Sequence, residues 1–492
     1  MPRRTRHAPV SAPAPSSARS PASSSVRSPG GEGRPSAATL AVTATATAVA
    51  LMNYTAPMPT LPAVAAAFGT PPSAQAWLLN GTPLGLAAFL LVAGGLADAY
   101  GRRRVFLLGT LALGLTTALG ALAGSTPAFT AARIAQGAAS AAVLAGSLGL
   151  LAHAYPTGRD RIRATGLWGA SVSGGIALGP LLAGALSLTD WRLAYGALGA
   201  GALATAATGA RWLPGPEPRQ TAAKRTSEAG APHPTPYSAP RPAPRPDVMG
   251  ALTLGLALAA LLTALTLGRD GWLRAPVGAL LLASAALTAL FAAVEARSGN
   301  PMIDLALLRR PAFLASTLGA LFTGLAVIGL FSVVPALLQA GTGMSALDTA
   351  WLFLLWSGTA FVAALQARRL AVRLSAAHQL ALGFVLSAAG VLTFLGALEG
   401  HAGAWRLLPG LLVAGAGSGL LNAALPRLAV DSVPPERAAM GSGANNTARY
   451  IGSSAGVSLT LALATAGPDA ALVASAALAV TGAALALVLA RR

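Results

Sequence analysis

The sequence contains no cysteine, a single lysine and few acidic residues. The lack of cysteine among 492 residues excludes disulfides, thiolate metal sites and cysteine nucleophiles. Charged residues make up only 10% of the chain, whereas a soluble globular domain carries about 25%. No Gly-x-x-x-x-Gly-Lys-Ser/Thr loop occurs, which excludes direct drive by ATP, and the linear chemistry supports no enzyme. The hydrophobic content of 54% points instead to a membrane protein.

The 34 Lys and Arg residues alternate along the chain. Twenty-eight of them fall in every second gap between long apolar blocks, four lie in the other gaps, and Arg133 and Arg449 lie inside apolar blocks. Cytoplasmic loops keep positive charge because its translocation is unfavourable, so the pattern predicts a polytopic helical membrane protein. The basic residues form no patch or stripe, so the net charge of +19 does not indicate a nucleic-acid partner.

Apolar blocks long enough to cross a bilayer, which takes about 20 residues, occur fourteen times. The predicted spans, all helical, cover residues 38–60, 74–97, 105–124, 127–153, 165–188, 193–213, 248–268, 274–296, 312–338, 346–367, 377–398, 405–428, 438–464 and 469–490. An even number of spans puts both termini on one side, and the basic gaps put that side in the cytoplasm. The abundance of Ala, Gly and Pro suggests a GC-rich bacterial genome. The sequence thus predicts an all-α protein of the bacterial inner membrane with both termini cytoplasmic.

Polar segments of low complexity divide the spans. Residues 1–37 are rich in Pro, Ser, Ala and Arg, which predicts a disordered cytoplasmic tail. Residues 214–247 have a similar composition and predict a cytoplasmic linker between six spans and eight. Many transporters are built from two six-helix halves with the substrate site between them. We therefore expect a six-helix half at 38–213, an extra helix pair at 248–296 and a second half at 297–492.

A glycine turn with a carboxylate and an arginine cluster follows the second predicted span. The segment runs Gly94-Gly-Leu-Ala-Asp98-Ala-Tyr-Gly101-Arg102-Arg103-Arg104. Pinched between two spans, these charges can form a clamp at the cytoplasmic face that breaks and re-forms as two halves move. The alternative is that the arginines only fix the topology and that Asp98 is a solvated partner.

Arg133 lies inside the fourth predicted span, in the segment Arg133-Ile-Ala-Gln136-Gly137. A cation at the bilayer centre costs roughly 2.5–3.5 kcal/mol, which makes Arg133 a candidate for function. Arg133 and Gln136 are three residues apart and share one helix face, so both are predicted to face a central cavity. The alternative is that Arg133 lies near the outer interface and extends its charge to the headgroups.

The fifth predicted span carries Gly175, Gly179, Pro180 and Gly184. Gly175 and Gly179, at positions i and i+4, form a smooth face that allows a neighbouring helix to approach closely. Pro180 frees a backbone carbonyl and bends the helix. A plain packing role is compatible with this pattern.

These three segments, in this order, resemble the motifs of the major facilitator superfamily. Residues 94–104 are similar to its Gly-x-Leu-Ala-Asp-Arg-x-Gly-Arg-Arg loop signature, with Ala99 where a basic residue is usual. The Arg133 segment resembles the second motif, Arg-x-x-Gln-Gly, and residues 175–184 resemble the antiporter motif of exporters. The late segment Asn446-Thr-Ala-Arg449-Tyr-Ile-Gly452 resembles one of the fourteen-span drug:proton antiporter branch. The resemblance implies the family's fold, with two further spans after the central linker, and efflux of drugs.

The first predicted span departs from that branch. The branch usually has Leu-Asp-x-Thr-x-x-Asn-x-Ala-Leu-Pro, whereas here Asn53 stands in place of the acid and Met58 in place of the asparagine. None of the fifteen Asp and Glu residues is placed mid-membrane. A proton relay normally uses a buried carboxylate or His, so proton coupling would have to run through peripheral groups such as Asp98 or through the substrate. The missing acid weakens the case for cationic substrates, and Arg133 and Arg449 would suit an anionic or zwitterionic one.

The leading interpretation is a proton-linked secondary active exporter of hydrophobic or amphipathic small molecules. The alternatives are an uncoupled metabolite exporter or facilitator and a non-transporting sensor on the same scaffold. We expect the substrate, protons and the lipid bilayer as partners, and a monomer without cofactor or metal. The predicted cavity and coupling residues are Asn53, Thr55, Met58, Asn80, Arg133, Gln136, Trp168, Asn422 and Arg449.

Overall fold

A computed structural model gives the fold and describes residues 33–155, 158–215, 248–268, 271, 273–298, 307, 309–370, 374–400, 404–434 and 438–491. Every regular element in these ranges is helical. The predicted tail lies outside the described residues up to residue 32, and the predicted linker lies outside them from residue 216 onward.

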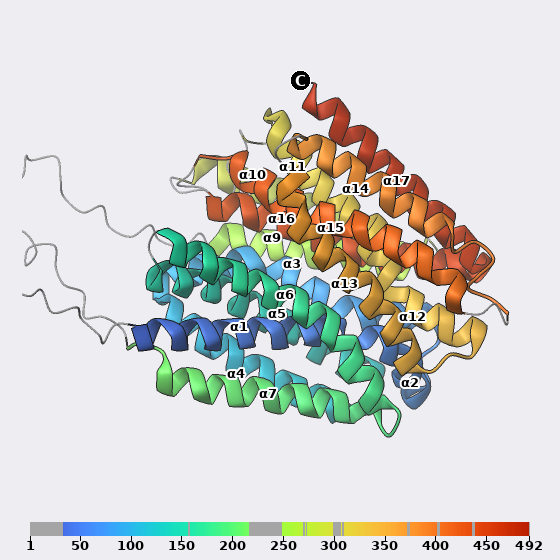
Figure 1. Cartoon of the computed structure of the whole chain (residues 1–492), viewed down its shortest axis with the longest axis horizontal. Coiled ribbons are helices and arrows are strands. Elements are labelled where there is room, and N and C mark those ends of the chain that lie inside the picture. Colours follow the sequence, from blue (N-terminus) through green and yellow to red (C-terminus); the bar gives the residue numbers. More distant parts are fainter. Residues whose placement is uncertain are drawn as a thin grey trace, which may run out of the picture.

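The helices before the linker form an N-terminal bundle, at the bottom of the view in Figure 1. They are α1 (Gly33–Thr55), α2 (Pro57–Phe68), α3 (Gln75–Tyr100), α4 (Arg102–Ala121), α5 (Thr126–Ala154), α6 (Gly158–Ser187) and α7 (Trp191–Trp212), with a short 3₁₀ turn at Pro72–Ala74. Within this bundle α5 packs against α3 and α4, α4 against α7, and α1 against α6.

The helices after the linker form an extra pair and a C-terminal bundle. The pair is α9 (Val248–Leu267) and α10 (Ala275–Arg297). The bundle is α11 (Pro311–Phe322), α12 (Gly329–Thr342), α13 (Ala346–Leu370), α14 (Ala376–Leu392), α15 (Leu408–Asp431), α16 (Ala438–Leu463) and α17 (Pro468–Ala490), with 3₁₀ turns at Ala404–Leu407 and Ala464–Ala466. In this bundle α15 packs against α13 and α14, and α14 against α17.

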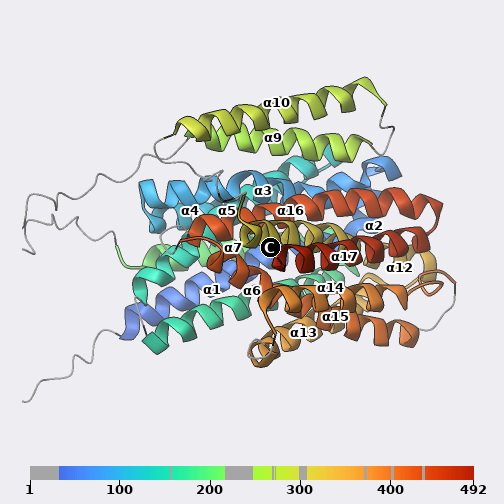
Figure 2. The same cartoon turned by 90° about the horizontal axis from the view of Figure 1, so that it is seen from above.

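The two bundles meet mainly through three helix pairs. These pairs are α3 with α16, α6 with α13, and α2 with α12. The extra pair lies on one flank, where α9 packs mainly against α3 and also contacts α16, while α10 packs against α9 (Figure 2). The extra pair thus covers one side of the junction between the bundles.

Within the described residues, ten helical stretches are long and apolar enough to cross a membrane, judged by length and composition. Three more apolar helices are shorter, at Pro57–Phe68, Leu252–Leu267 and Ala376–Leu392. α7 and α16 belong to neither group because Gly, Thr and Arg in α7 and Ser, Asn and Thr in α16 lower their hydropathy. The architecture is therefore all-helical and multi-pass, and the count of fourteen spans stays a prediction.

Two of the predicted spans contain an interruption of the regular α-helix. α1 and α2 are separated at Ala56, just before Pro57, but the Ala56 N–H still donates to the Met52 carbonyl at 2.9 Å. Proline has no backbone N–H to donate and its ring crowds the preceding turn. Pro57 therefore explains why the helix is interrupted at Ala56. α11 and α12 are joined by a π-helical turn, η4 (Thr323–Ile328). Both interruptions lie on helices that meet the opposite bundle.

Small residues set how closely the helices approach. A methyl group at Gly85 of α3 would overlap the Ile134 carbonyl of α5, and one at Gly137 of α5 would overlap the Thr82 carbonyl of α3. Helices in lipid associate through such close contacts because no hydrophobic driving force acts between them there. The α3–α5 pair therefore requires glycine at both positions, and this contact fixes where Arg133, one turn before Gly137, points.

Candidate functional site

Arg133 is fully buried in the N-terminal bundle. Its Nη1 donates to the Asn53 carbonyl oxygen at 2.8 Å, to Asn53 Oδ1 at 2.8 Å and to Gln136 Oε1 at 2.7 Å. Its Nη2 also donates to the Tyr54 carbonyl at 3.4 Å. One charged group thus joins α5 to α1 at the end of α1, beside the interruption at Ala56.

A second layer of contacts holds the acceptors of Arg133 in place. Gln136 Nε2 donates to the Thr116 carbonyl of α4 at 3.1 Å, and Asn53 Nδ2 donates to Thr117 Oγ1. The guanidinium of Arg133 also lies 5.8 Å from the ring centroid of Tyr195 in α7. Cation–π contact of this kind stabilises a desolvated cation. The cluster therefore ties α1, α4, α5 and α7 together. The acceptors of Arg133 Nη1 and Nη2 are all neutral, and its buried Nε has no acceptor among the described residues.

A small cavity lies at the junction of the two bundles. Its lining comes from α1, α2, α3, α12 and α16, and consists of Tyr54, Pro57, Met58, Leu79, Pro83, Ser332 and Val457. A mostly apolar lining with a few polar groups is typical of sites for small molecules. Of the predicted cavity residues, Met58 lies in this lining.

Tyr54 closes one side of this cavity by linking the bundles. Its hydroxyl lies 3.1 Å from Ser453 Oγ of α16, and its ring meets the edge of Tyr450 with centroids 5.9 Å apart. Through its backbone carbonyl the same residue accepts from Arg133. Tyr54 therefore connects the Arg133 cluster to α16.

Arg449 lies on α16, one turn before Ser453. Its Nε and Nη2 atoms are buried, and among the described residues neither has a hydrogen-bond acceptor. Arg449 interacts electrostatically with Tyr54 and Tyr450. The second arginine of the predicted site is therefore a partly exposed cation with two buried nitrogens, beside two tyrosines at the junction of the bundles.

Four other predicted site residues lie elsewhere. Asn80 Nδ2 donates to Ser458 Oγ at 2.9 Å and to Thr266 Oγ1 at 3.4 Å, which ties α3 to α16 and α9. Trp168 Nε1 donates to Thr47 Oγ1 and Ser147 Oγ, both at 3.0 Å. Thr55 bonds to a carbonyl of its own helix at 3.1 Å, and Asn422 has an exposed side chain on α15. Asn80 and Trp168 thus join helices rather than line the cavity.

The glycines of the antiporter-like segment lie on two different contacts of α6. Methyl groups at Gly175 and Gly179 would overlap Ala48 and Thr55, so this face lies directly against α1. At Gly184 a Cβ would lie 2.8 Å from the Ala346 carbonyl of α13. Pro180 lies between these contacts, inside the helix. The segment therefore packs within its own bundle first and then against the opposite bundle.

The face of α6 that meets α13 has free space towards the other end of α6. Gly166 is 18 residues before Gly184, which at 100° per residue is five full turns, so both lie on the same face. A Cβ at Gly166, Gly169 or Gly174 would meet no described atom within 4 Å. α6 is thus in contact with α13 near Gly184 and has free space on the same face at Gly166.

The contact between the bundles near Gly184 includes a hydrogen bond between α12 and α2. Gln339 Nε2 donates to the Pro59 carbonyl at 2.9 Å and lies 3.5 Å from Thr349 Oγ1. This end of the molecule, where α2 lies, is called the α2 end. The end formed by residues 101–104 is called the arginine end.

Arg102 and Arg103 at the arginine end bind carbonyl groups of neighbouring helices. Arg102 Nη1 donates to the Gly149 carbonyl at 3.1 Å, and Arg103 Nη2 donates to the Ala210 carbonyl at 2.9 Å. Ala210 is in the last turn of α7, where carbonyls lack helical partners and attract cations, and Gly149 lies five residues before the end of α5. Gly101 has φ +98°, which favours glycine, and a Cβ at Gly94 would meet no described atom within 4 Å. The Asp98 side chain lies outside the described residues.

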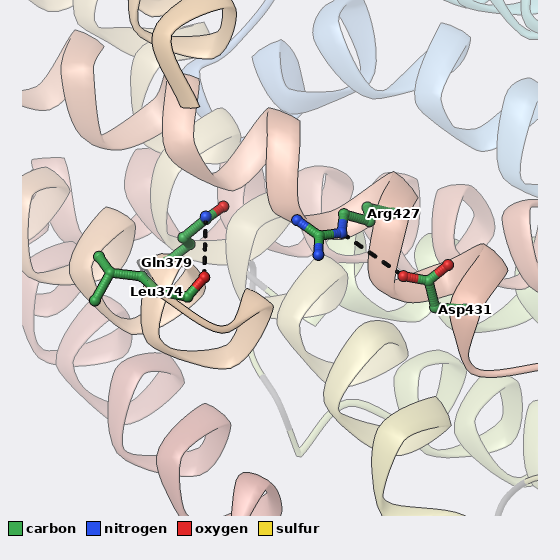
Figure 3. Close-up of polar contacts among 4 residues, drawn as sticks. All are labelled: Leu374, Gln379, Arg427 and Asp431. Atoms are coloured by element: carbon green, nitrogen blue, oxygen red, sulfur yellow. Dashed lines mark hydrogen bonds and ion pairs between the residues drawn. The ribbon is translucent and has the colours of Figure 1, made fainter. Parts of the chain in front are cut away.

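Near the loop between α13 and α14 of the C-terminal bundle, the polar contacts are of a different kind (Figure 3). Gln379 Nε2 donates to the Leu374 carbonyl at 3.3 Å, and Arg427 Nε lies 3.7 Å from Asp431 Oδ2 on its own helix. The Arg427 and Asp431 side chains are 49% and 64% exposed, so this pair contributes little to stability. Residues 371–373 lie outside the described ranges.

The described acidic residues lie at helix ends or in loops. Asp160, Asp348 and Asp469 are in first turns, Asp190 is an N-cap, and Asp431 ends α15. Glu295 is buried near the end of α10 and Glu399 lies in a loop. Among the described residues no group of three or more His, Cys, Asp or Glu side chains could hold a metal ion.

Sequence reasoning missed Thr117, Tyr195, Tyr54, Tyr450 and Ser453. The signal for the tyrosines was present, because each lies inside an apolar block and Tyr450 follows Arg449 directly. A buried tyrosine usually finds a partner for its hydroxyl. Thr117 and Ser453 carried no such signal, since Ser and Thr are frequent throughout the spans.

Comparison with known proteins gives the family. The model of the Major Facilitator Superfamily matches residues 43–457. Multidrug resistance protein Stp of Mycobacterium tuberculosis (strain CDC 1551 / Oshkosh) is 30% identical over 399 residues, covering 80% of this chain and 70% of that protein. The probable actinorhodin transporter of Streptomyces coelicolor is 31% identical over 415 residues, covering 81% and 67%.

Solved structures give the same fold. A crystal structure of the peptide transporter POT has a TM-score of 0.66 at 16% identity and covers 92% of this chain and 94% of that chain. A bacterial homologue of the human lysosomal transporter Spinster has a TM-score of 0.63 at 14% identity and covers 92% and 96%. The family match, the efflux relatives and the packing of the antiporter-like segment agree. The chain belongs to the major facilitator superfamily of multi-pass membrane transporters.

Proposed function

We propose that this protein exports hydrophobic or amphipathic small molecules from the cytoplasm by secondary active transport. The observation that carries the proposal is the cavity between the two bundles, which side chains of both bundles line. A site at the interface of two halves is what alternating access requires. Relatives described as multidrug resistance and antibiotic resistance proteins support drug or secondary-metabolite efflux.

The proposed topology is that of the fourteen-span branch in a bacterial plasma membrane. α1 with α2, and α11 with η4 and α12, each serve as one span, and the two bundles are the two six-helix halves. The arginine end is assigned to the cytoplasm, with both termini there, because positive loops stay on that side. The carrier acts as a monomer.

Coupling of export to protons requires groups that can bind and release a proton. The described acidic residues lie at helix ends or in loops, and Arg133 donates to the neutral Asn53 and Gln136. Titration at peripheral groups such as Asp98 or on the substrate would then have to supply the coupling. The same observation favours the uncoupled exporter as the second candidate function.

Cellular accumulation tests the export function. The chain is expressed in an efflux-deficient bacterium, and the accumulation of a panel of neutral, cationic and anionic dyes is measured with and without a proton uncoupler. Ser332→Trp should fill the cavity and raise accumulation to the level of an empty vector, because Ser332 is buried in the lining. Leu119→Trp, on an exposed position of α4, is the matched control and should leave accumulation low.

The outcomes separate the candidates. Export that stops with the uncoupler supports proton-linked transport, and export that continues supports the uncoupled exporter. Unchanged accumulation of every dye, with protein present in the membrane, would contradict export and favour a sensor on the same scaffold.

A further inference from the structure

Arg449 presents a positive charge that the described protein does not neutralise. Its buried Nε and Nη2 atoms have no acceptor among the described residues, and the described carboxylates lie at helix ends or in loops. Arginine stays protonated in proteins, so the charge persists. A buried charge is stabilised only when it is paired and hydrogen-bonded. The guanidinium therefore favours an anion that comes from outside the chain.

The groups around Arg449 suit such an anion. Arg449 interacts with Tyr54 and Tyr450, and the Tyr54 hydroxyl lies 3.1 Å from Ser453 Oγ. Hydroxyl groups donate to anionic oxygens, and a guanidinium binds carboxylate or sulfonate with two parallel hydrogen bonds. The edge-to-face tyrosine pair adds an aromatic wall. These residues together supply charge, hydrogen bonds and apolar surface.

Arg449 is also placed at the entrance to the cavity. Val457 lines the cavity, and Arg449 precedes it by eight residues, or about 12 Å along the helix towards the arginine end. The π-helical turn η4 packs here, because Gly324 lies directly against the Arg449 carbonyl. Such turns occur frequently at functional sites. A molecule that reaches the cavity from the arginine end thus passes Arg449.

We propose that the exported molecule is an amphiphile with one anionic group, which binds Arg449 and the Tyr54 hydroxyl while its apolar part packs against the residues that line the cavity. The proposal rests on the proposed export function and narrows its substrate class. Arg133 cannot take this role, since its Nη1 already donates to three acceptors inside the N-terminal bundle.

A matched pair of probes tests this proposal. Anilinonaphthalene sulfonate is an anion, and N-phenylnaphthylamine has the same skeleton without the sulfonate. Binding of both is measured with the full chain in nanodiscs of phosphatidylcholine, with empty nanodiscs as background. The unaltered protein should bind the sulfonate more tightly than the neutral probe.

Four variants show which residue accounts for the difference in binding between the two probes. Arg449→Gln should weaken sulfonate binding at least about tenfold, or about 1.4 kcal/mol, and change binding of the neutral probe less than about twofold. Tyr54→Phe keeps the ring and should produce a smaller loss for the sulfonate alone. Arg427→Gln, which removes an exposed arginine of the same bundle, should change neither. Arg449→Lys keeps the charge and should restore part of the affinity if Gln perturbs folding.

Three results would overturn the proposal. They are equal affinity of the unaltered protein for the two probes, equal losses for both probes in Arg449→Gln, and displacement of the sulfonate by phosphatidylglycerol in the nanodisc, which would assign the site to a lipid headgroup. The accumulation assay is independent of these measurements. Absent efflux with an intact binding difference would refute the export function and leave the anion site standing.

Discussion

Arg133 in the N-terminal bundle and Arg449 in the C-terminal bundle differ in what surrounds each guanidinium. Arg133 Nη1 donates to three oxygens at 2.7–2.8 Å, from Asn53 and Gln136, and its guanidinium lies 5.8 Å from the Tyr195 ring centroid. Arg449 has two buried nitrogens without an acceptor among the described residues, and Arg133 has one, its Nε. We therefore propose different roles for two arginines that look alike in sequence, one structural and one open to a ligand.

Tyr54 belongs to both environments. Its carbonyl accepts from Arg133 and its hydroxyl meets Ser453, one turn from Arg449. A ligand that binds at Arg449 would compete for this hydroxyl and act on a residue that Arg133 holds. The Arg133 cluster therefore holds the backbone of Tyr54 in place, while a ligand at Arg449 would act on the Tyr54 hydroxyl.

Replacement of Arg133 should have the largest effect. In Arg133→Gln the oxygens of Asn53 and Gln136 lose their charged donor, and a buried polar group without a partner costs about 1–3 kcal/mol. We expect the free energy of unfolding to fall by about 2–4 kcal/mol and transport to be lost. Thermal unfolding of the purified protein measures the first and dye accumulation the second. Arg427→Gln should shift the unfolding free energy by less than about 1 kcal/mol, and an equal shift in the two variants would refute the structural role.

Overpacking of α6 should have the next largest effect. In Gly179→Leu the side chain would overlap Met52 and Thr55 and push α1 away from the Arg133 cluster, at about 1–3 kcal/mol of unfolding free energy. Gly174→Leu is the control, because a Cβ there meets no described atom within 4 Å. Thermal unfolding compares the two variants. Similar destabilisation by both would mean that α6 does not pack as described.

A carboxylate at position 53 should strengthen the contact between Arg133 and α1. In Asn53→Asp the oxygen that accepts from Arg133 at 2.8 Å becomes charged, and charge-assisted hydrogen bonds are about twice as strong as neutral ones. We expect a rise of about 1 kcal/mol in unfolding free energy at neutral pH, reduced by the lost bond to Thr117. The variant also gains a buried acid, so pH-driven uptake into inverted vesicles should become faster. Equal uptake by variant and wild type would show that coupling does not depend on this residue.

Replacement of Arg449 should have the smallest effect on stability and the opposite sign to that of Arg133. Arg449→Gln removes a cation whose buried Nε and Nη2 have no acceptor among the described residues, so the unfolding free energy should stay the same or rise by up to about 1 kcal/mol. Arg449→Lys keeps the charge and should show no gain. Both are measured by thermal unfolding without added anions. A fall as large as that of Arg133→Gln would remove the distinction between the two arginines.

The multi-pass helical architecture followed from the sequence because arginine placement and apolar length are local signals. The shared face of Arg133 and Gln136 likewise needs only helical periodicity. The partners of Asn53 and Asn80 could not be predicted, since they depend on how each helix is rotated about its axis. Gly and Ala cover every face of these helices, so the sequence does not mark which face meets which neighbour. For this reason Asn80 and Trp168 were expected in the cavity and instead tie helices together.

The π-helical turn at Thr323–Ile328 has a consequence for the register of α12. A π-helical turn accommodates one residue more than an α-helical turn, and one residue corresponds to a rotation of about 100°. Everything after the turn is therefore rotated relative to α11, including Gln339, which is eleven residues or about 16 Å further on. Deletion of one residue within the turn would point Gln339 away from the Pro59 carbonyl. The contact between Gln339 and Pro59 at the α2 end therefore depends on the number of residues in the π-helical turn η4, which lies against Arg449.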